Sequence, residues 1–397
     1  MIPNARLETV TEADLLALID HGVRESRTLD YKRGWPAERD ARAELAKDVC
    51  AFANTLGGDL VFGMIELGGV PTQLEPLQFA NLDAELLAMT NALRDLLEPR
   101  VSGGLHPHPV PLAAGGHAVV LRVAPSPGAP HRVTRDNHFY ARTSVGKEPM
   151  DMHGIRNAFA ASASLAQQVL AFRDNALMNI VRGEGPVPDL AFPACVCHVV
   201  PVSAVTRPEG HDIDTLRAAA AHLQTAGPSQ RALARAGVNL QGALCLADRD
   251  ENEARPAYTQ LYRDGCVELV DGALLRRGWA PRPDEELRVV YPELYELPLV
   301  RHGFRAIADT LEALEVPAPA YLMLSWLFAR GTRIGYAVNA HRAAYPALPP
   351  HLTQLTAPPV YLDDFSIDPL TVLRPAFDVM WNAVGIAHTL TDFDARG

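Results

Sequence analysis

The stretch AFANTLGGDLVFGMIE, residues 51–66, joins the end of a predicted helix to a predicted strand. Apolar residues recur at helical spacing over residues 38–56, which predicts one amphipathic helix there. Gly57 and Gly58 follow at once, and glycine most easily adopts the left-handed conformation that ends a helix. DLVFGMI, residues 59–65, is almost entirely apolar and predicts a buried strand. This helix and strand belong to a predicted order of strand, helix, strand, helix, strand, strand and helix over residues 28–162, which indicates a mixed α/β domain.

A second strand is predicted on the N-terminal side of this stretch, at TLDYK, residues 28–32. Side chains alternate across a strand, so Leu29 and Tyr31 would face one way and Asp30 and Lys32 the other. The remaining elements predicted for this part of the chain are a helix capped by Thr11 and Asp14, a helix over 79–98, strands over 116–123 and 138–143, and a helix over 150–162.

The chain divides into two predicted domains, residues 1–163 and 164–397. In the second, PACVCHVVPV at 193–202 predicts a buried strand. Its CVCH segment is weak evidence for a metal site, because no second ligand pair follows at the spacing of zinc sites. Residues 258–277 predict strand, turn and strand, and residues 301–330 predict a helix. The predicted fold class is α+β: an N-terminal mixed α/β domain followed by a second mixed α/β domain.

The composition is typical of a soluble globular protein, with 48% apolar and 21% charged residues in a chain of 397. No apolar run approaches the roughly 18 residues that a membrane span needs. The N-terminus lacks the basic and then apolar pattern of a signal peptide. The five scattered cysteines favour reduced thiols. We therefore expect a cytoplasmic protein that has no membrane partner.

The charge is acidic overall but locally basic. A formal net charge of −11 counts against a protein that coats nucleic acid by bulk charge. Between residues 122 and 156, however, six basic residues stand against three acidic ones. This strip is either a nucleic-acid surface or a set of scattered solvated charges. Its candidate nucleic-acid contacts are Arg132, Arg135, Arg142 and Lys147.

Three acids and one lysine around the TLDYK strand make up the inventory of a phosphodiesterase site. Such hydrolysis needs a divalent metal, and Mg²⁺ or Mn²⁺ is held by carboxylate oxygens. Glu25, Asp30 and Glu66 supply carboxylates, and Lys32 would neutralise the attacked phosphate. Clustered acids repel, so one of them should hold its proton more tightly without metal. Alternatively, these residues are the solvated face of a strand.

Three blocks in order, ESRTLDYK (25–32), AFANTLGGDLVFGMIE and HFYARTSVGKEPMDMHGI (138–155), resemble the AlbA-type domain of Schlafen proteins and their bacterial relatives. The resemblance covers about residues 10–160. It implies that Glu25, Asp30 and Glu66 hold the metal, Mn²⁺ or Mg²⁺, and that Lys32 is the motif lysine. Asp30 stands where the family has glutamate and Glu66 where it has aspartate, so the charges are kept and the arm lengths differ.

The resemblance implies a metal-dependent endonuclease that cleaves structured RNA such as tRNA in preference to DNA, in anti-phage defence or stress response. Schlafen cores pair two such domains into a clamp, and this chain has one copy, so a homodimer would rebuild the clamp. A non-catalytic nucleic-acid-binding (DNA-binding) regulator and a protein-interaction module are the alternatives. No phosphate-loop motif is present, so ATP hydrolysis is not expected.

Overall fold

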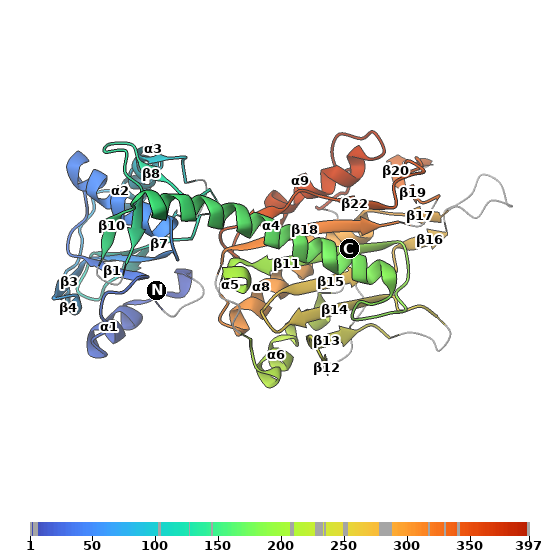
Figure 1. The fold of residues 1–397 in the computed structure, drawn as a ribbon, viewed down its shortest axis with the longest axis horizontal. Coiled ribbons are helices and arrows are strands. Elements are labelled where there is room, and N and C mark those ends of the chain that lie inside the picture. Colours follow the sequence, from blue (N-terminus) through green and yellow to red (C-terminus); the bar gives the residue numbers. More distant parts are fainter. Residues whose placement is uncertain are drawn as a thin grey trace. The chain divides into compact units, whose positions relative to one another are not determined.

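The chain folds into two compact α+β units, Met1–Ala166 and Gln167–Gly397, in this computed structural model (Figure 1). The structure describes residues 2, 7–101, 105–126, 128–143, 146–206, 210–226, 233, 236–248, 253–277, 288–316, 318–328, 331–339 and 342–394. The units divide inside helix α4 (Met152–Arg182), which includes most of the helix predicted over residues 150–162 and continues well beyond its predicted end. No described helix is long and apolar enough to cross a membrane.

A four-stranded sheet organises the N-terminal unit, with strand order β1-β2-β7-β6. β1 and β2 run parallel, and helix α2 connects them; the other neighbours are antiparallel. The elements are β1 (Leu29–Lys32), α2 (Arg39–Ala53), β2 (Gly58–Phe62), β6 (Leu105–Pro111) and β7 (His117–Val123).

The sheet lies between two apolar layers, which explains why β2 is buried along its whole length. Leu60 and Phe62 join the core under α2 and α3 (Leu82–Leu96). Val61 joins the opposite core together with Leu29 and Tyr31, against α1 (Glu12–Asp20). The predicted alternation of β1 is therefore confirmed, and Asp30 and Lys32 face the same side of the sheet as α2.

The predicted strand over residues 59–65 is divided in the structure. Gly63 has a φ of +83°, a left-handed conformation that turns the chain away from the sheet after β2. The chain then forms a hairpin of β3 (Met64–Leu67) and β4 (Val70–Leu74). An apolar run alone does not show such a break. The hairpin carries Glu66 out of the sheet.

Strand β6 was not predicted from the sequence, because it contains three prolines. Pro107, Pro109 and Pro111 alternate, so all three ring nitrogens point to the same side of the strand. Among the strands that the structure describes, β6 pairs only with β7 and forms the sheet edge. Missing N–H groups are tolerated on the open side of an edge strand.

The other elements of the N-terminal unit surround this sheet. Thr11 and Asp14 form the predicted capping box at the start of α1, with the Thr11 N–H donating to Asp14 at 2.8 Å. The remaining elements are η1 (Leu7–Thr9), β5 (Leu97–Glu98), β8 (Arg132–Val133), β9 (Tyr140–Arg142) and β10 (Lys147–Pro149).

Gly57→Ala is expected to lower the free energy of unfolding by about 3 kcal/mol. Gly57 has the predicted left-handed conformation, with φ +68°, which an alanine adopts at a cost of about 1–2 kcal/mol. A Cβ atom there would also lie 2.6 Å from the Val123 carbonyl oxygen, which belongs to the backbone and cannot easily move. Gly115, with φ +85° and open space around it, is the matched control. Equal losses for the two alanine variants in denaturant unfolding would contradict this account.

An eight-stranded antiparallel sheet forms the centre of the C-terminal unit. Its strands, by position in the chain, are β11 (Ala194–Pro201), β12 (Gly237–Asn239), β13 (Gly242–Leu246), β14 (Ala257–Tyr262), β15 (Val267–Asp271), β18 (Ala320–Leu327), β22 (Gln354–Thr356) and β23 (Val360–Leu362). The end of α4 packs on one face, through Leu177 and Ile180. The other face of the sheet packs on a large apolar core that includes residues of α6 (Ile213–Ala219), α8 (Phe304–Ala313) and α9 (Pro369–Asn382). β11 is therefore buried on both sides.

Short helices and strands complete this unit. The helices are α5 (Val202–Thr206), α6 (Ile213–Ala219), η2 (His222–Thr225), α7 (Glu293–Pro298), η3 (Leu299–Gly303), α8 (Phe304–Ala313) and α9 (Pro369–Asn382). The strands are β16 (Leu275–Arg277), β17 (Arg288–Val290), β19 (Arg333–Ile334), β20 (Tyr336–Asn339) and β21 (Arg342–Ala344).

The prediction of one helix over residues 301–330 is wrong in its second half. Helix α8 ends at Ala313, and AYLMLSWL forms the central strand β18. A continuous apolar run of this length is compatible with a buried helix or a buried strand, and periodicity cannot separate them. The CVCH segment lies in β11, as predicted, and its two cysteines are free thiols.

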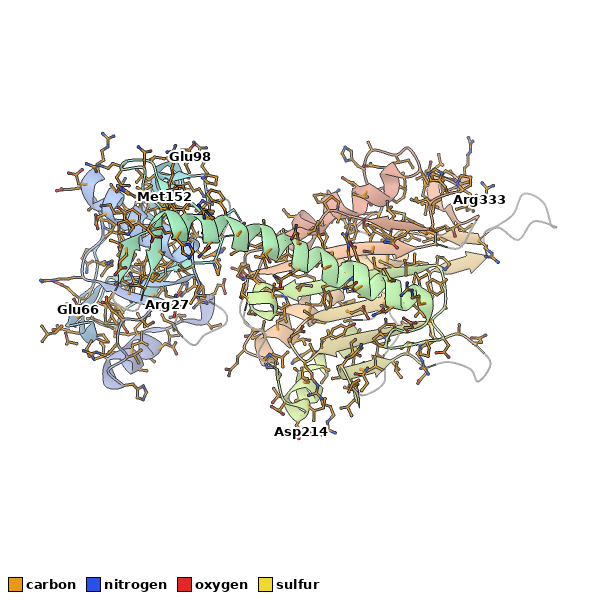
Figure 2. The ribbon with its side chains drawn as sticks, viewed as in Figure 1. Arg27, Glu66, Glu98, Met152, Asp214 and Arg333 are labelled. Carbon is orange, nitrogen blue, oxygen red and sulfur yellow. The ribbon has the colours of Figure 1, made fainter. Side chains whose placement is uncertain are left out.

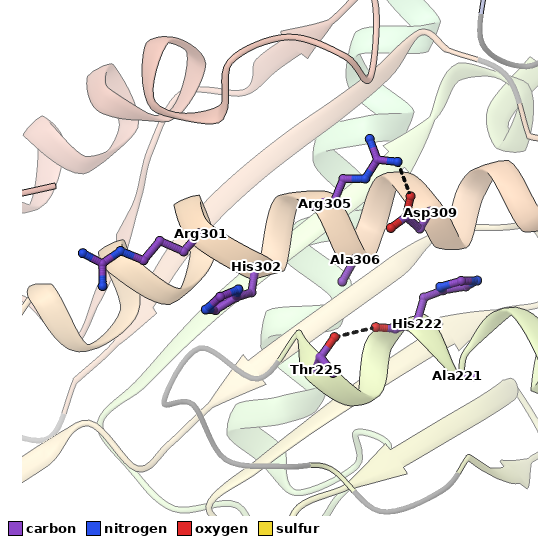
Figure 3. A pocket seen from close by; sticks show the side chains of 8 residues that line it. All are labelled: Ala221, His222, Thr225, Arg301, His302, Arg305, Ala306 and Asp309. Carbon is purple, nitrogen blue, oxygen red and sulfur yellow. Dashed lines mark hydrogen bonds and ion pairs between the residues drawn. The ribbon is translucent and has the colours of Figure 1, made fainter. Parts of the chain in front are cut away.

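An open cavity of about 340 Å³ lies in the C-terminal unit between η2 and α8 (Figure 3). Arg305 and Asp309 line the cavity and form an ion pair at 2.8 Å. The charge of the Arg305 guanidinium group is therefore neutralised within α8. His222 and His302 line the same cavity and are exposed.

Candidate metal and nucleic-acid site

Glu25 and Asp30 form a hydrogen-bonded acid pair at the start of β1. Glu25 Oε1 also accepts the Tyr31 N–H at 2.9 Å, and the Glu25 N–H donates to the Gly69 carbonyl oxygen at 2.8 Å. Asp30 is only 4% exposed. The pair is therefore fixed between the strand and the turn of the β3–β4 hairpin.

Below about pH 7 this pair holds one proton, on Glu25. Burial, followed by the hydrogen bond with Asp30, raises the pKa of Glu25 to about 7. Burial opposes ionisation of Asp30 as well, but the hydrogen bond from Glu25 and the charges of Lys32 and Arg142 outweigh it and lower the pKa of Asp30. The prediction that one clustered acid keeps its proton is confirmed, with burial rather than repulsion as the largest cause.

The raised pKa of Glu25 gives a pH-dependent stability. The folded protein binds this proton up to about pH 7, whereas the unfolded chain loses it near 4.5. Stability should therefore fall as the pH rises between these values, by up to about 2 kcal/mol after allowance for partial exposure. Glu25→Gln should remove this loss. Hydrogen exchange of β1 peptides at pH 5 and pH 8 measures it, and an unchanged pH dependence in the variant would refute the assignment.

Asp48 is the residue of this site that the sequence interpretation missed. It lies on α2, is 3% exposed, and faces Asp30 across two bridging cations. Lys32 Nζ lies 2.9 Å from Asp30 Oδ2 and 3.3 Å from Asp48 Oδ2. Arg142 Nη1 lies 3.3 Å from Asp30 and 3.5 Å from Asp48. A signal was present: Asp48 stands beside Leu45 and Val49 on the apolar face of the predicted helix, where an acid needs partners.

Glu66 lies on β3 and is exposed (Figure 2). Its carboxylate accepts the Gly69 N–H in the hairpin turn. Its negative charge contributes to the raised pKa of Glu25, although burial and Asp30 contribute more. The hairpin turn thus connects Glu66 to Glu25 through Gly69.

A hard divalent cation fits the Glu25–Asp30 pair in chemistry, since such ions take carboxylate oxygens. Within the described ranges, no group of three or more His, Cys, Asp or Glu side chains is arranged to hold a metal ion. Glu66 is linked to Glu25 through Gly69, but it does not complete such a group with the pair. The predicted three-acid ligand set is therefore present as a pair with a neighbouring third acid.

Two of the predicted nucleic-acid contacts lie at the surface in ion pairs. Arg132 Nε donates to Glu98 at 3.0 Å, and Arg135 lies 2.7 Å from Asp40. Their side chains are 39% and 50% exposed. Exposed pairs of this kind are weak and can exchange partners.

The other two predicted contacts belong to the acid cluster. Arg142 is 5% exposed and lies against the Phe52 ring, 4.8 Å from its centre. Lys147 on β10 lies 2.9 Å from Asp48 and 2.8 Å from Glu44. Arg142 therefore neutralises buried acids, whereas Lys147 is partly open to solvent.

Residues 25–151 match the family model described as Schlafen, AlbA_2. No curated protein matches this sequence. One similar solved structure is the crystal structure of the DIP2311 protein from Corynebacterium diphtheriae, at 19% identity and a TM-score of 0.24. The match covers 35% of this chain and 27% of that chain. This chain thus spans about a quarter of that protein.

Another similar structure is the solution structure of the N-terminal domain of a putative ATP-dependent DNA helicase RecG-related protein from Nitrosomonas europaea. It is 18% identical, has a TM-score of 0.24, and the match covers 30% of this chain and 74% of that chain. The family match, which includes Glu25, Asp30 and Asp48, associates the N-terminal unit with a nucleic-acid-related function. The N-terminal unit therefore contains a Schlafen AlbA-type domain over residues 25–151.

Proposed function

We propose that the N-terminal unit is a metal-dependent endonuclease whose substrate is structured RNA such as tRNA. The observation that carries this proposal is the Glu25–Asp30 pair, which holds one proton and lies beside Lys32. Two acids kept in contact at the cost of burial are typical of a site that exchanges a proton for a cation.

The residues of the pair would have distinct roles. Bound by Glu25 and Asp30, Mn²⁺ or Mg²⁺ would supply water activation and charge screening. Glu25 would release its proton when the ligand set is complete. The pKa of Asp30 is already lowered by the hydrogen bond from Glu25 and by the charges of Lys32 and Arg142. The Lys32 ammonium group, which lies beside Asp30, would neutralise the attacked phosphate.

A non-catalytic nucleic-acid-binding regulator is the second candidate. One observation favours it: Asp30 and Asp48 already have cationic partners, as they would in a purely structural network. Against it, acids beside bound phosphates repel the ligand, so a simple binding protein gains nothing from them.

A cleavage assay tests the proposal. The purified chain is incubated with labelled tRNA, single-stranded DNA and duplex DNA, each with Mn²⁺, Mg²⁺ or chelator, beside the Asp30→Asn and Glu66→Gln variants. Metal-dependent cutting that both variants lose supports the nuclease. Binding without cutting, unchanged in the variants, supports the regulator. We infer a homodimer acting in defence or stress response, and sedimentation as a monomer at micromolar concentration would contradict the dimer.

A further inference from the structure

The chain contains only three lysines, and all three lie in the N-terminal unit. They are Lys32, Lys47 and Lys147, against 33 arginines among the 36 basic residues. The chain thus has a guanidinium group at nearly every basic position and an ammonium group at these three alone.

The three lysines belong to one ion-pair network. Lys47 and Lys147 both contact Glu44, each at 2.8 Å. Lys147 and Lys32 both contact the same oxygen of Asp48, at 2.9 and 3.3 Å. Lys32 then contacts Asp30 at 2.9 Å. The network follows one face of α2, because its members on that helix are three and four residues apart.

An ammonium group suits this arrangement better than a guanidinium group. It is a compact point charge, so two of them can approach one carboxylate oxygen, whereas the planar guanidinium fork pairs with a whole carboxylate. The three lysine side chains are 33%, 27% and 20% exposed. Solvent therefore reaches this side of the network, unlike the buried Arg142.

The two carboxylates of the network differ in exchangeability. The Asp48 side chain is 4% exposed, so its charge cannot leave its cationic partners without a large cost. The Glu44 side chain is 57% exposed, and its displaced carboxylate would enter water. The oxygens of an arriving phosphate group could take the place of Glu44 between Lys47 and Lys147.

We propose that Lys47, Lys147 and Lys32 form a row that binds successive phosphates of a nucleic-acid backbone and ends at the Glu25–Asp30 pair. Asp48 fixes the row, and Glu44 occupies it in the free protein. This inference rests on the proposed function, because it names the part of the substrate that the site holds. It replaces the exposed arginines Arg132 and Arg135 as the main phosphate contact.

Binding measured without cleavage tests the row. The full chain is titrated with a fluorescein-labelled single-stranded RNA in chelator, and anisotropy is followed over a range of salt concentrations. The double variant Lys47→Gln/Lys147→Gln should bind at least about tenfold more weakly at low salt, with a salt slope reduced by about 1.4, or 0.7 for each lost contact. The matched control, Arg132→Gln/Arg135→Gln, removes the same charge from two exposed ion pairs and should change binding by less than about twofold.

A variant that is expected to tighten binding separates an effect on binding from an effect on folding. Glu44→Gln removes the carboxylate that lies between Lys47 and Lys147, while Lys147 keeps its contact with Asp48, and should tighten binding several-fold. Asp95→Asn, which removes an exposed acid paired with Arg100, should not. Disruption of the folded row would weaken binding, so tighter binding by Glu44→Gln is the opposite of the effect expected from misfolding. Three results would overturn the row. They are equal losses of affinity in the lysine and arginine double variants, no gain of affinity with Glu44→Gln, and no binding by the unmodified chain. If the chain cleaves RNA and the lysine double variant binds RNA normally, the row is wrong and the nuclease stands. If binding depends on the lysines but no cleavage occurs, the nuclease is wrong and the row stands.

Discussion

Asp30→Asn is expected to lower metal-dependent cleavage at least about a hundredfold while nucleic-acid binding stays unchanged or becomes tighter. Asp30 combines two contacts that asparagine cannot both replace: a hydrogen bond to Glu25, and a negative charge that holds Lys32. Asparagine keeps the size of the side chain and removes the charge that would hold a divalent cation. Removing one acid also removes repulsion of the phosphates. The measurement pairs the value of kcat/KM for cleavage with RNA affinity in chelator.

Asp59→Asn is the matched control for this result. Asp59 is a buried aspartate of the same sheet, on β2. It lies 2.8 Å from Arg122, with which it forms an ion pair separate from the Glu25–Asp30 pair. Asp59→Asn replaces the same carboxylate by the same amide as Asp30→Asn does. It should lower stability but leave cleavage intact below the unfolding temperature of the variant. If both variants lose cleavage together with hydrogen-exchange protection, folding explains the result. Full cleavage by Asp30→Asn would leave the acid pair a structural role and favour the regulator.

The local features of this site could be read from the sequence, because each depends on residues close together in the chain. Alternation placed Asp30 and Lys32 on one face of β1, and Gly57 has the predicted left-handed conformation, although α2 itself ends earlier, at Ala53. The break at Gly63 was missed, since a glycine inside an apolar run is compatible with a continuous strand.

The partners of the charged residues could not be read in the same way. Asp48 is 94 residues from Arg142 and 99 from Lys147, and only the fold brings β9 and β10 onto α2. For the same reason, a strip that is basic in sequence divides in the structure. Arg142 enters the interior, Lys147 joins the acids, and Arg132 and Arg135 stay outside. Local patterns identify which residues carry charge, whereas tertiary contacts decide which charges remain available to a ligand.

Arg142→Met is expected to lower the stability of the N-terminal unit by about 3 kcal/mol. Arg142 Nη1 bridges Asp30 and Asp48. Without it, both acids would stay buried, Asp30 with Lys32 as its cationic partner and Asp48 with Lys32 and Lys147. Methionine keeps the contact with Phe52 but leaves two carboxylates short of positive charge, and uncompensated buried charge is among the costliest defects in a protein.

Hydrogen exchange of β1 and α2 peptides in the full chain reports this loss within one unit, without assuming that both units unfold together. Arg132→Met is the control, because it removes the same charge from an exposed pair with Glu98 and should cost less than about 1 kcal/mol. The loss should shrink as the pH falls toward the range in which carboxylates protonate, since a neutral acid no longer needs the guanidinium group. Similar small losses in both variants would show that Lys32 and Lys147 neutralise the two aspartates unaided, and that Arg142 packs against Phe52 without holding the acid site together.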